Sequence, residues 1–260
     1  MSFEIDLSAR RALVTGAGQH NGRAIARELA AAGAEVSVND IVAERAEQVS
    51  REIEESGGVA RPAVFDVTDS RAAGDAIAEH APDILVNNVG DTGAGNAPGS
   101  APVFSTALFL ESDPGDWTRL LDINLYGVMY CTHAALPKMI ERGWGRVITI
   151  VSDAGRVPSR RMVAYSAAKA GAAGFSRSIA AEVGRSGVTV NCVSLGTILS
   201  EHVSAEAADQ SYQRMRRDYL APRLGRPDDA AGMVVFLASP WADWITGQTY
   251  PVNGGFSATL

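Results

Sequence analysis

Residues 11–40 read RALVTGAGQHNGRAIARELAAAGAEVSVND, and this stretch decides the fold class. The apolar run at residues 12–14 predicts a first strand, and the amphipathic run at 23–32 predicts a helix that ends at Gly33. Residues 35–39 predict the next strand. A strand, a glycine-rich turn, a helix and a second strand in this order form a unit whose two strands lie parallel in one sheet.

The same alternation continues along the chain. We expect further strands at residues 63–65, 84–87, 146–151, 188–193 and 249–252, and further helices at 43–55, 70–80, 116–142, 163–185 and 228–238. Short apolar strands separated by helices are typical of a parallel sheet covered on both faces. The sequence therefore predicts one doubly wound α/β domain over residues 1–260. Two segments, 91–115 and 197–227, break the alternation, and segments this long are usually functional.

Composition narrows the class of protein. The 260 residues carry a net charge of −7, which argues against a nucleic-acid partner. Cys131 and Cys192 form neither a metal motif nor a disulfide framework, so we expect buried thiols and no metal. No charge-free apolar run of about 18 residues is present, and residues 1–16 lack the apolar core of a signal peptide. We therefore expect no membrane partner and a cytoplasmic location.

The turn after the first strand predicts a nucleotide site. Residues 15–22 read TGAGQHNG and lie between a predicted strand and a predicted helix. Glycine lets backbone N–H groups approach a pyrophosphate, and the helix N-terminus adds partial positive charge there. The expected contacts are Gly16, Gly18, Gln19, His20, Asn21 and Gly22. The alternative is an ordinary turn between a strand and a helix.

Asp40 follows the second predicted strand, near the spacing of about 20 residues expected for an acid that binds a ribose 2′-hydroxyl. A carboxylate there accepts hydrogen bonds from the ribose and repels a 2′-phosphate, and Asn39, Ile41 and Val42 are not basic. These observations favour NAD over NADP as the cofactor, with Ile41 beside Asp40 in the site. The alternative is that Asp40 only caps the helix expected from residue 43.

Two more strand ends carry polar residues or glycine. Asp66 and Val67 follow the third strand, where Asp66 can accept from an adenine amino group or cap the next helix. The fourth strand ends in the sequence Asn-Asn-Val-Gly at residues 87–90. Gly90 lets the backbone pass beside the cofactor, and the paired asparagines, of which Asn88 is an expected contact, can fasten neighbouring strands.

A phenol and an ammonium occur four residues apart in the helix expected at 163–185. Tyr165 and Lys169 therefore face the same way. A nearby cation lowers the pKa of a tyrosine, so Tyr165 can take a proton from an alcohol or return it to an alkoxide. Ser152 ends the fifth strand and can hydrogen-bond the substrate oxygen. Asn124, a polar residue among apolar neighbours, can hold a water that links Lys169 to solvent.

Together these residues resemble the short-chain dehydrogenase/reductase family, in particular its classical members. The resemblance covers essentially the whole chain and includes residues 15–22, Asp66, residues 87–90, Asn124, Ser152, Tyr165, Lys169, and the closing pattern of residues 247–255. It implies a Rossmann-type sheet of seven parallel strands. It also implies a catalytic tetrad of Asn124, Ser152, Tyr165 and Lys169, with Lys169 holding the nicotinamide ribose. It further implies homotetramers, with the long helices at 116–142 and 163–185 at one interface.

The sequence departs from the family pattern at three places. The turn usually reads TGxxxGxG, and its middle glycine is His20 here. Because histidine tolerates a left-handed backbone better than most residues, we expect the turn to survive with altered phosphate contacts, to which His20 can itself contribute. The usual Pro-Gly after the sixth strand reads Leu195-Gly196, so the loop that carries Gly196 and Thr197 beside the nicotinamide is expected to be less rigid. Val89 replaces the usual alanine, a packing change.

The predicted activity is NAD-dependent interconversion of a secondary alcohol and a ketone by hydride transfer, with Tyr165 as the acid/base. Hydroxyacyl thioesters, sterols, sugars and small cyclic alcohols all stay open as substrates. One alternative is an NADPH-dependent 3-oxoacyl-thioester reductase, against which Asp40 argues. Another is a non-catalytic NAD-binding sensor, against which the intact tetrad argues.

Two segments are expected near the substrate. The family's variable substrate lid corresponds to residues 197–227, where Tyr212, Met215, Tyr219 and Leu220 lie near Arg214, Arg216 and Arg217. These arginines either meet a phosphate of coenzyme A or a carrier, or form a solvated helix face. Residues 98–110 add Phe104, Leu108, Phe109 and Leu110, which either wall a substrate mouth or pack on another subunit.

Overall fold

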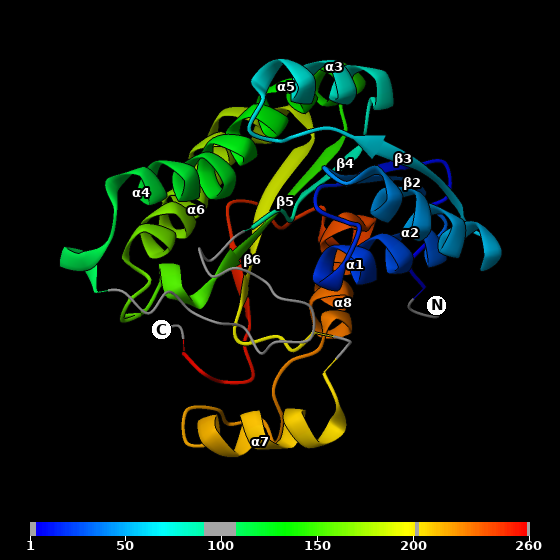
Figure 1. The fold of residues 1–260 in the computed structure, drawn as a ribbon. Coiled ribbons are helices and arrows are strands. Elements are labelled where there is room, and N and C mark those ends of the chain that lie inside the picture. Colours follow the sequence, from blue (N-terminus) through cyan, green and yellow to red (C-terminus); the bar gives the residue numbers. More distant parts are fainter. Residues whose placement is uncertain (1–3, 91–107, 201–202, 259–260) are drawn as a thin grey trace.

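The computed structural model describes residues 4–90, 108–200 and 203–258. Seven parallel strands form one sheet in the order β3-β2-β1-β4-β5-β6-β7 (Figure 1). The strands are β1 (Arg11–Val14), β2 (Glu35–Asp40), β3 (Val59–Val64), β4 (Ile84–Asn87), β5 (Gly145–Ser152), β6 (Val188–Leu195) and β7 (Thr249–Val252). The chain builds outward from β1 to β3, then crosses to β4 and builds outward to β7. The doubly wound sheet expected from the sequence is therefore confirmed.

Helices cover both faces of the sheet (Figure 1). One face carries α1 (His20–Ala31), α2 (Ala43–Glu55) and α8 (Pro227–Ala238). The other carries α3 (Ser70–His80), α5 (Gly127–Arg142) and α6 (Val163–Val183), and α4 (Pro114–Leu121) packs against α6. Successive residues of β4 point to opposite faces of the sheet. Ile84 and Val86 belong to the core under α1, α2 and α8, and Leu85 belongs to the core under α3, α5 and α6. This alternation follows from the period of two along a strand.

The long helix expected at residues 116–142 is interrupted. The structure has α4, then a π-helical turn at Asp122–Tyr126, then α5. A π turn widens the helix locally, and such turns are frequent at functional sites. The expectation of one continuous helix was therefore wrong, and the turn that replaces its middle contains Asn124.

The connections contain little regular structure. The segment at 197–227 contains α7 (Ala205–Met215). Short 3₁₀ turns occur at Phe109–Glu111, Asp153–Gly155, Gly184–Ser186 and Pro240–Ala242. None of the helices in the described part of the chain has the length and apolar character needed to span a bilayer. Cys131 and Cys192 are buried and unpaired, as expected, and burial raises the pKa of the Cys131 thiol to about 12.

Candidate active site

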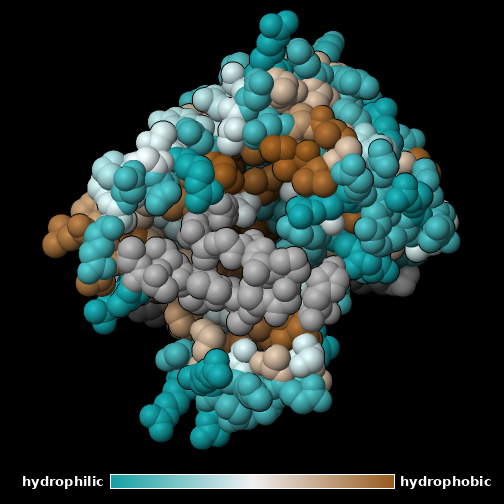
Figure 2. All heavy atoms as spheres, viewed as in Figure 1, coloured by the Kyte–Doolittle hydropathy of each residue, from teal (hydrophilic) through white to brown (hydrophobic). Residues whose placement is uncertain are grey.

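A cavity of about 1270 Å³ lies where the carboxyl ends of the strands meet. Its lining includes residues that follow β1 to β6, together with residues of α4, of α6 and of the segment after β6. Figure 2 shows hydrophobic side chains gathered beside a hollow in this face, while much of the remaining surface is hydrophilic. In open parallel sheets, ligands bind outside the carboxyl ends of strands where the strand order reverses, which is between β1 and β4 here. This cavity is therefore the candidate site.

The turn after β1 reaches the cavity mainly through its backbone. Gly16 has φ 61°, and a Cβ at Gly22 would collide with the Gly16 carbonyl oxygen, so both positions require glycine. His20, the first residue of α1, has φ 50°, a left-handed conformation. The turn thus forms with histidine where the family pattern has glycine, as expected. Gln19, His20 and Asn21 line the cavity together with Gly16 and Gly22.

Gly18 lies outside the cavity lining, unlike the other predicted residues of the turn. A Cβ at this position would collide with the carboxylate of Asp40 and with Cβ of Arg45. Glycine therefore serves here to let the end of β2 and the start of α2 pack closely against the turn. The structure gives Gly18 no place in the cavity wall, and its direct contact with a cofactor stays a prediction.

Asp40 is the last residue of β2 and is 6% exposed. Its Oδ1 accepts a hydrogen bond from the Val42 backbone N–H at 2.9 Å. Val42, not Asp40, occupies the N-cap position of α2, and no side chain caps this helix. The alternative that Asp40 is merely a helix cap is therefore wrong, and its carboxylate lines the cavity beside the exposed side chain of Ile41.

Arg45 also lines the cavity at this end. It belongs to the first turn of α2. This cation was missed from the sequence, where only Asn39, Ile41 and Val42 were taken as neighbours of Asp40. The signal was present, because a residue in the first turn of the helix after β2 returns toward the end of that strand.

The ends of β3 and β4 are fixed by side-chain hydrogen bonds. Oδ1 of Asp66 accepts from both the backbone N–H and the hydroxyl of Thr68 at 2.8 Å, and Asp69 caps α3. Asp66 therefore does not cap that helix, and it lines the cavity with Val67. Asn88 Nδ2 donates to the carbonyl oxygens of Thr15 and Gly16 at 2.9 and 3.1 Å, which fastens β4 to the glycine turn. The preceding Asn87 instead donates to Thr132 of α5.

Lys169 of α6 lies at the base of the cavity and is 3% exposed. Its Nζ donates to the Ile150 carbonyl oxygen at 3.0 Å and lies 5.8 Å from the ring centroid of Tyr165. Burial lowers the pKa of Lys169 from 10.5 to about 8. A Cβ at Gly90 would stand 3.1 Å from this Nζ, so the glycine makes room for the ammonium.

Asn124 is fully buried in the π-helical turn, and its Nδ2 donates to the Leu120 carbonyl oxygen at 3.0 Å. Its Oδ1 lies 3.2 Å from the same Cβ position at Gly90 that approaches Lys169 Nζ. Asn124 is the one predicted tetrad residue that does not itself line the cavity. The structure therefore places its amide beside Lys169, behind the wall that Gly90 forms.

Ser152 and Tyr165 line the cavity with Lys169. Ser152 is the last residue of β5, and its Oγ accepts from the Ala154 N–H at 3.2 Å. Tyr165 lies in the first turn of α6, where the positive end of the helix dipole favours a phenolate. Three predicted tetrad residues therefore converge on one cavity from β5 and α6, which adjoin in the fold.

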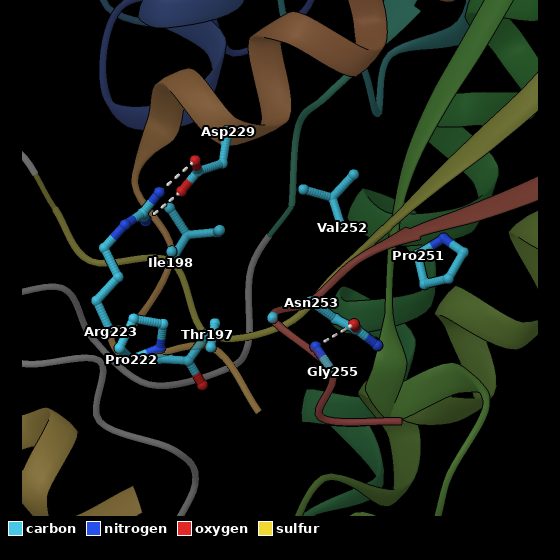
Figure 3. A pocket seen from close by; sticks show the side chains of 12 residues that line it. Thr197, Ile198, Pro222, Arg223, Asp229, Pro251, Val252, Asn253 and Gly255 are labelled. Carbon is cyan, nitrogen blue, oxygen red and sulfur yellow. Dashed lines mark hydrogen bonds and ion pairs between the residues drawn. The ribbon is translucent and has the colours of Figure 1, made fainter. Parts of the chain in front are cut away.

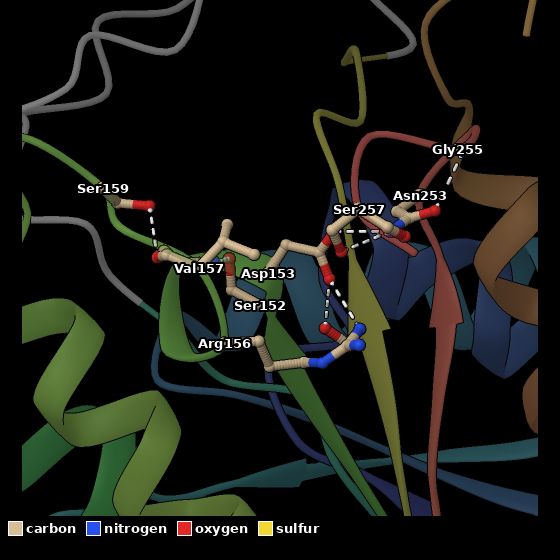
Figure 4. Close-up of polar contacts among 10 residues, drawn as sticks. Ser152, Asp153, Arg156, Val157, Ser159, Asn253, Gly255 and Ser257 are labelled. Atoms are coloured by element: carbon tan, nitrogen blue, oxygen red, sulfur yellow. Dashed lines mark hydrogen bonds and ion pairs between the residues drawn. The ribbon is translucent and has the colours of Figure 1, made fainter. Parts of the chain in front are cut away.

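A buried carboxylate follows Ser152 directly. Asp153 is 2% exposed and accepts four hydrogen bonds, several of them visible in Figure 4. The donors are Arg156 Nη1 at 3.1 Å, Ser194 Oγ at 2.7 Å, Asn253 Nδ2 at 2.5 Å and Ser257 Oγ at 2.8 Å. A buried charge is tolerated only when it is paired and hydrogen-bonded. The sequence analysis did not single out Asp153, which ties the turn after Ser152 to the turn after β7.

The turn after β7 also closes one side of the cavity. Phe256 and Tyr219 line the cavity, and their ring centroids are 5.3 Å apart. Thr197 donates its backbone N–H to the Tyr219 hydroxyl at 2.9 Å, and the two hydroxyls are also 2.9 Å apart. The predicted contacts Gly196 and Thr197 line the cavity as well.

A second pocket of about 490 Å³ shares Thr197 and Ile198 with the main cavity (Figure 3). An ion pair crosses it, in which Arg223 Nη1 and Asp229 Oδ2 are 2.6 Å apart. The segment after β6 thus separates two hollows.

Residues of the predicted substrate lid at 197–227 differ in whether they line the cavity. Met215 and Tyr219 line the cavity, whereas Arg214, Arg216 and Arg217 are exposed and absent from its lining. This placement favours the solvated helix face for these arginines. Of the earlier apolar segment, Phe104 lies outside the described residues. Leu108, Phe109 and Leu110 are exposed and do not line the cavity, and Phe109 stacks on Trp117 at 4.8 Å.

The doubly wound sheet, the glycine turn at its switch point and the tyrosine–lysine pair beside it define a Rossmann-type oxidoreductase. The family described as enoyl-(acyl carrier protein) reductase matches residues 16–257. This chain belongs to the short-chain dehydrogenase/reductase family, and it is an oxidoreductase that acts on CH–OH groups.

Two curated relatives illustrate the range of the family. The chain is 35% identical over 259 residues to the 3-oxoacyl-[acyl-carrier-protein] reductase FabG of Aquifex aeolicus, covering 97% of this chain and 99% of that protein. It is 33% identical over 260 residues to the 7alpha-hydroxysteroid dehydrogenase of Escherichia coli, covering 98% of this chain and 96% of that protein.

Two solved structures are also similar. One is an NAD(P)-dependent protein of Beutenbergia cavernae with bound NADP, provisionally assigned as a gluconate 5-dehydrogenase. It has a TM-score of 0.86 at 32% identity, covering 97% of this chain and 98% of that one. The other is a 7 alpha-hydroxysteroid dehydrogenase complexed with NADH and 7-oxo glycochenodeoxycholic acid. It has a TM-score of 0.85 at 32% identity, covering 97% and 96%.

Proposed function

We propose that this protein is an NAD-dependent oxidoreductase that interconverts a secondary alcohol and its ketone by hydride transfer. The observation that carries the proposal is the buried ammonium of Lys169, 5.8 Å from the ring of Tyr165 in the cavity that Ser152 also lines. A cation beside a phenol favours its ionised form, and the N-terminus of α6 acts in the same direction. Tyr165 is therefore suited to act as the acid/base.

The residues at the switch point fit a nicotinamide dinucleotide. The cavity exceeds the range of about 300–1,000 Å³ common for small-ligand pockets, so it has room for a dinucleotide and a substrate. The backbone of the turn and the N-terminus of α1 suit a pyrophosphate. The carboxylate of Asp40 suits ribose hydroxyls, and Ile41 offers an apolar surface to an adenine. When bound, the nicotinamide accepts or supplies the hydride.

The chain's own residues manage the proton. Ser152 Oγ and the Tyr165 hydroxyl hold the substrate oxygen between them. In the oxidative direction Tyr165 takes the proton of that oxygen, and in the reductive direction it returns the proton. Lys169, fixed by its hydrogen bond to Ile150, stabilises the phenolate. The amide of Asn124 lies where it can hold a water that passes the proton from Lys169 toward solvent.

A second candidate function is an NADPH-dependent 3-oxoacyl-thioester reductase. Arg45 favours it, because a guanidinium beside Asp40 can pair with the 2′-phosphate that Asp40 alone would repel. The likeness to the Aquifex aeolicus reductase also supports it. We keep NAD as the first proposal because Asp40 is buried at the end of β2, whereas the side chain of Arg45 is exposed on α2.

The test is a two-cofactor, two-direction assay that follows the absorbance of reduced nicotinamide. NAD and NADP are each tested with secondary alcohols, and NADH and NADPH with ketones that include acetoacetyl-CoA. We expect turnover with a higher kcat/KM for NAD than for NADP. A preference for NADPH with acetoacetyl-CoA would establish the second candidate instead. Tight nucleotide binding without turnover of any pair would indicate a non-catalytic sensor.

A further inference from the structure

The segment between β5 and α6 brings two arginines to the cavity that the proposed chemistry does not use. Residues 158–162 all line the cavity, and they include Arg160 and Arg161. Both precede the helix whose first turn carries Tyr165. Both side chains are exposed, and neither forms an ion pair with any residue in the described part of the chain. Two guanidinium groups without an ion-pair partner among the described residues therefore line the cavity that Tyr165 also lines.

Arg156, a few residues earlier, shows what a structural arginine in this segment looks like. Its Nη1 lies 3.1 Å from Oδ1 of Asp153, and its side chain is 19% exposed. Arg156 is absent from the cavity lining. Arg160 and Arg161 differ from it because they are exposed, have no ion-pair partner within residues 4–90, 108–200 and 203–258, and form part of the cavity wall. Asp153 is thus paired with Arg156, and it forms no ion pair with Arg160 or Arg161.

The backbone conformation of Arg161 supports a role in ligand binding. Its φ is 68°, in the left-handed region that glycine and asparagine tolerate best. A residue with a long side chain is uncommon in this conformation, and such residues cluster where the surrounding structure holds a ligand clamp or an active site.

The carboxylates around the cavity differ in where they lie and in what they contact. Asp40 and Asp66 follow β2 and β3, on the nucleotide side. Asp153, after β5, has its carboxylate engaged by four donors. Asp122 also lines the cavity, from the π-helical turn, and forms no ion pair with either arginine within the described residues. In a chain of net charge −7, the wall at 158–162 is therefore a local positive surface.

We propose that Arg160 and Arg161 form a subsite for an anionic group, a carboxylate or a phosphate, that the substrate carries away from its reacting carbon. Guanidinium groups bind both anions through paired, charge-assisted hydrogen bonds. The inference rests on the proposed function, since it assigns a class of substrate to that site: an alcohol or ketone with an anionic tail. The arginines fix the tail at the mouth while the reacting oxygen meets Ser152 and Tyr165.

The test measures binding of matched probes by NMR titration in the presence of saturating NAD, so that nucleotide phosphate contacts are already filled. One pair is hexanoate and hexanamide, and the other is 4′-phosphopantetheine and pantetheine. We expect the anionic member of one pair to bind at least tenfold more tightly than its neutral partner. The pair that shows the preference identifies a carboxylate or a phosphate as the anion.

The variant that tests the subsite combines Arg160→Gln with Arg161→Asn, since asparagine tolerates the left-handed backbone at that position. The double variant should lose the preference for the anionic probe over the neutral one, and Arg160→Gln alone should weaken that preference. The control is Arg185→Gln, which removes the same charge from the 3₁₀ turn before β6, at the opposite edge of the sheet. That variant should keep the preference.

Equal binding within both pairs, or a preference that survives the double variant, would overturn the subsite. Failure of the proposed function has a different signature. A wild-type protein that shows the anion preference but turns over no alcohol or ketone would refute the oxidoreductase chemistry and leave the subsite standing. A protein that turns over ketones without any anion preference would refute only the subsite.

Discussion

The two ends of the cavity are held together in different ways. At the chemical end, Lys169, Asn124 and Asp153 are buried, and each has hydrogen-bond partners within the chain. At the nucleotide end, the glycine turn presents mainly backbone, while Ile41 and Arg45 are exposed. The chemical end therefore depends on the identity of particular side chains, and the nucleotide end depends on the path of the backbone.

The departure from the family pattern in the glycine turn fits this difference. At position 20 of the turn, histidine stands where the family pattern has glycine, and it adopts a left-handed backbone with φ 50°. None of the four predicted tetrad residues is replaced. Substitutions at the chemical end should therefore reduce turnover, and substitutions at the nucleotide end should mainly change the affinity or choice of nucleotide.

Tyr165→Phe should give the largest difference between an effect on turnover, at the chemical end, and an effect on nucleotide binding, at the nucleotide end. Removing the hydroxyl removes the acid/base, so we expect kcat to fall by about 10²–10⁴-fold, while the Kd for NAD measured by calorimetry stays within about twofold. Tyr126→Phe, the same change at an exposed tyrosine outside the cavity lining, should leave kcat unchanged. Near-normal turnover of the Tyr165 variant would remove it from the mechanism.

Asp40→Ala should affect the opposite end. Loss of charge-assisted hydrogen bonds to the ribose, and of repulsion toward a 2′-phosphate, should lower the NAD-to-NADP ratio of kcat/KM by about tenfold or more. Arg45→Ala should move the same ratio in the other direction. Paired kinetics with both nucleotides measure the two shifts. If neither variant alters the ratio, the nucleotide is selected elsewhere in the cavity.

Lys169→Met tests how strongly the chemical end is buried. The pKa of Lys169 is lowered from 10.5 to about 8, so below about pH 8 the folded state bears the full cost of a buried charge. Between about pH 8 and 10.5 the folded protein has released this proton while the unfolded chain still binds it, so the cost declines. Urea unfolding should show the variant more stable than wild type at neutral pH, with a gap that narrows above pH 8.

A gap between the Lys169 variant and wild type that stays constant from neutral to alkaline pH would contradict the lowered pKa. The comparison is made at each pH between the two proteins, so that the titration of all other groups cancels. Activity of the variant serves as a second readout, and it should be lost at every pH because the phenolate has no cation beside it.

The smallest effects are expected at His20. Both His20→Gly and His20→Ala remove the imidazole, but only glycine adopts φ 50° freely. His20→Ala should therefore be less stable than His20→Gly by about 1 kcal/mol in denaturant unfolding. If the imidazole binds a phosphate, the KM for NAD should rise by a similar factor in both. Equal stability of the two variants would show that the turn relaxes.

Most of the fold was predictable because its signals are local. The bounds expected for α2, α3, β4 and β7 agree with the structure, since each is set by apolar periodicity and nearby turn residues. The π-helical turn was missed because its five residues are too few to establish a period of their own. No residue type distinguishes that turn from the flanking helix.

The residues of the candidate site that follow strands or share a helix could be predicted from the sequence. Hydrogen bonds between residues far apart in the sequence could not. Tyr165, Lys169 and Ser152 were found from local spacing, and the structure brings them to one cavity. Arg45 was missed because it enters the site from the first turn of α2 and not from the residues directly adjacent to Asp40. The partners of Asp153 lie as many as 104 residues away in the sequence, so no local pattern could reveal them.

The carboxylate of Asp153 has a consequence for how the protein is made. Two of its four donors, Asn253 and Ser257, are synthesised 100 and 104 residues after it. While they are still inside the exit tunnel, the nascent chain cannot satisfy the charge beside Ser152. The carboxylate beside Ser152 therefore gains its full set of donors only after the turn that follows β7 has left the ribosome.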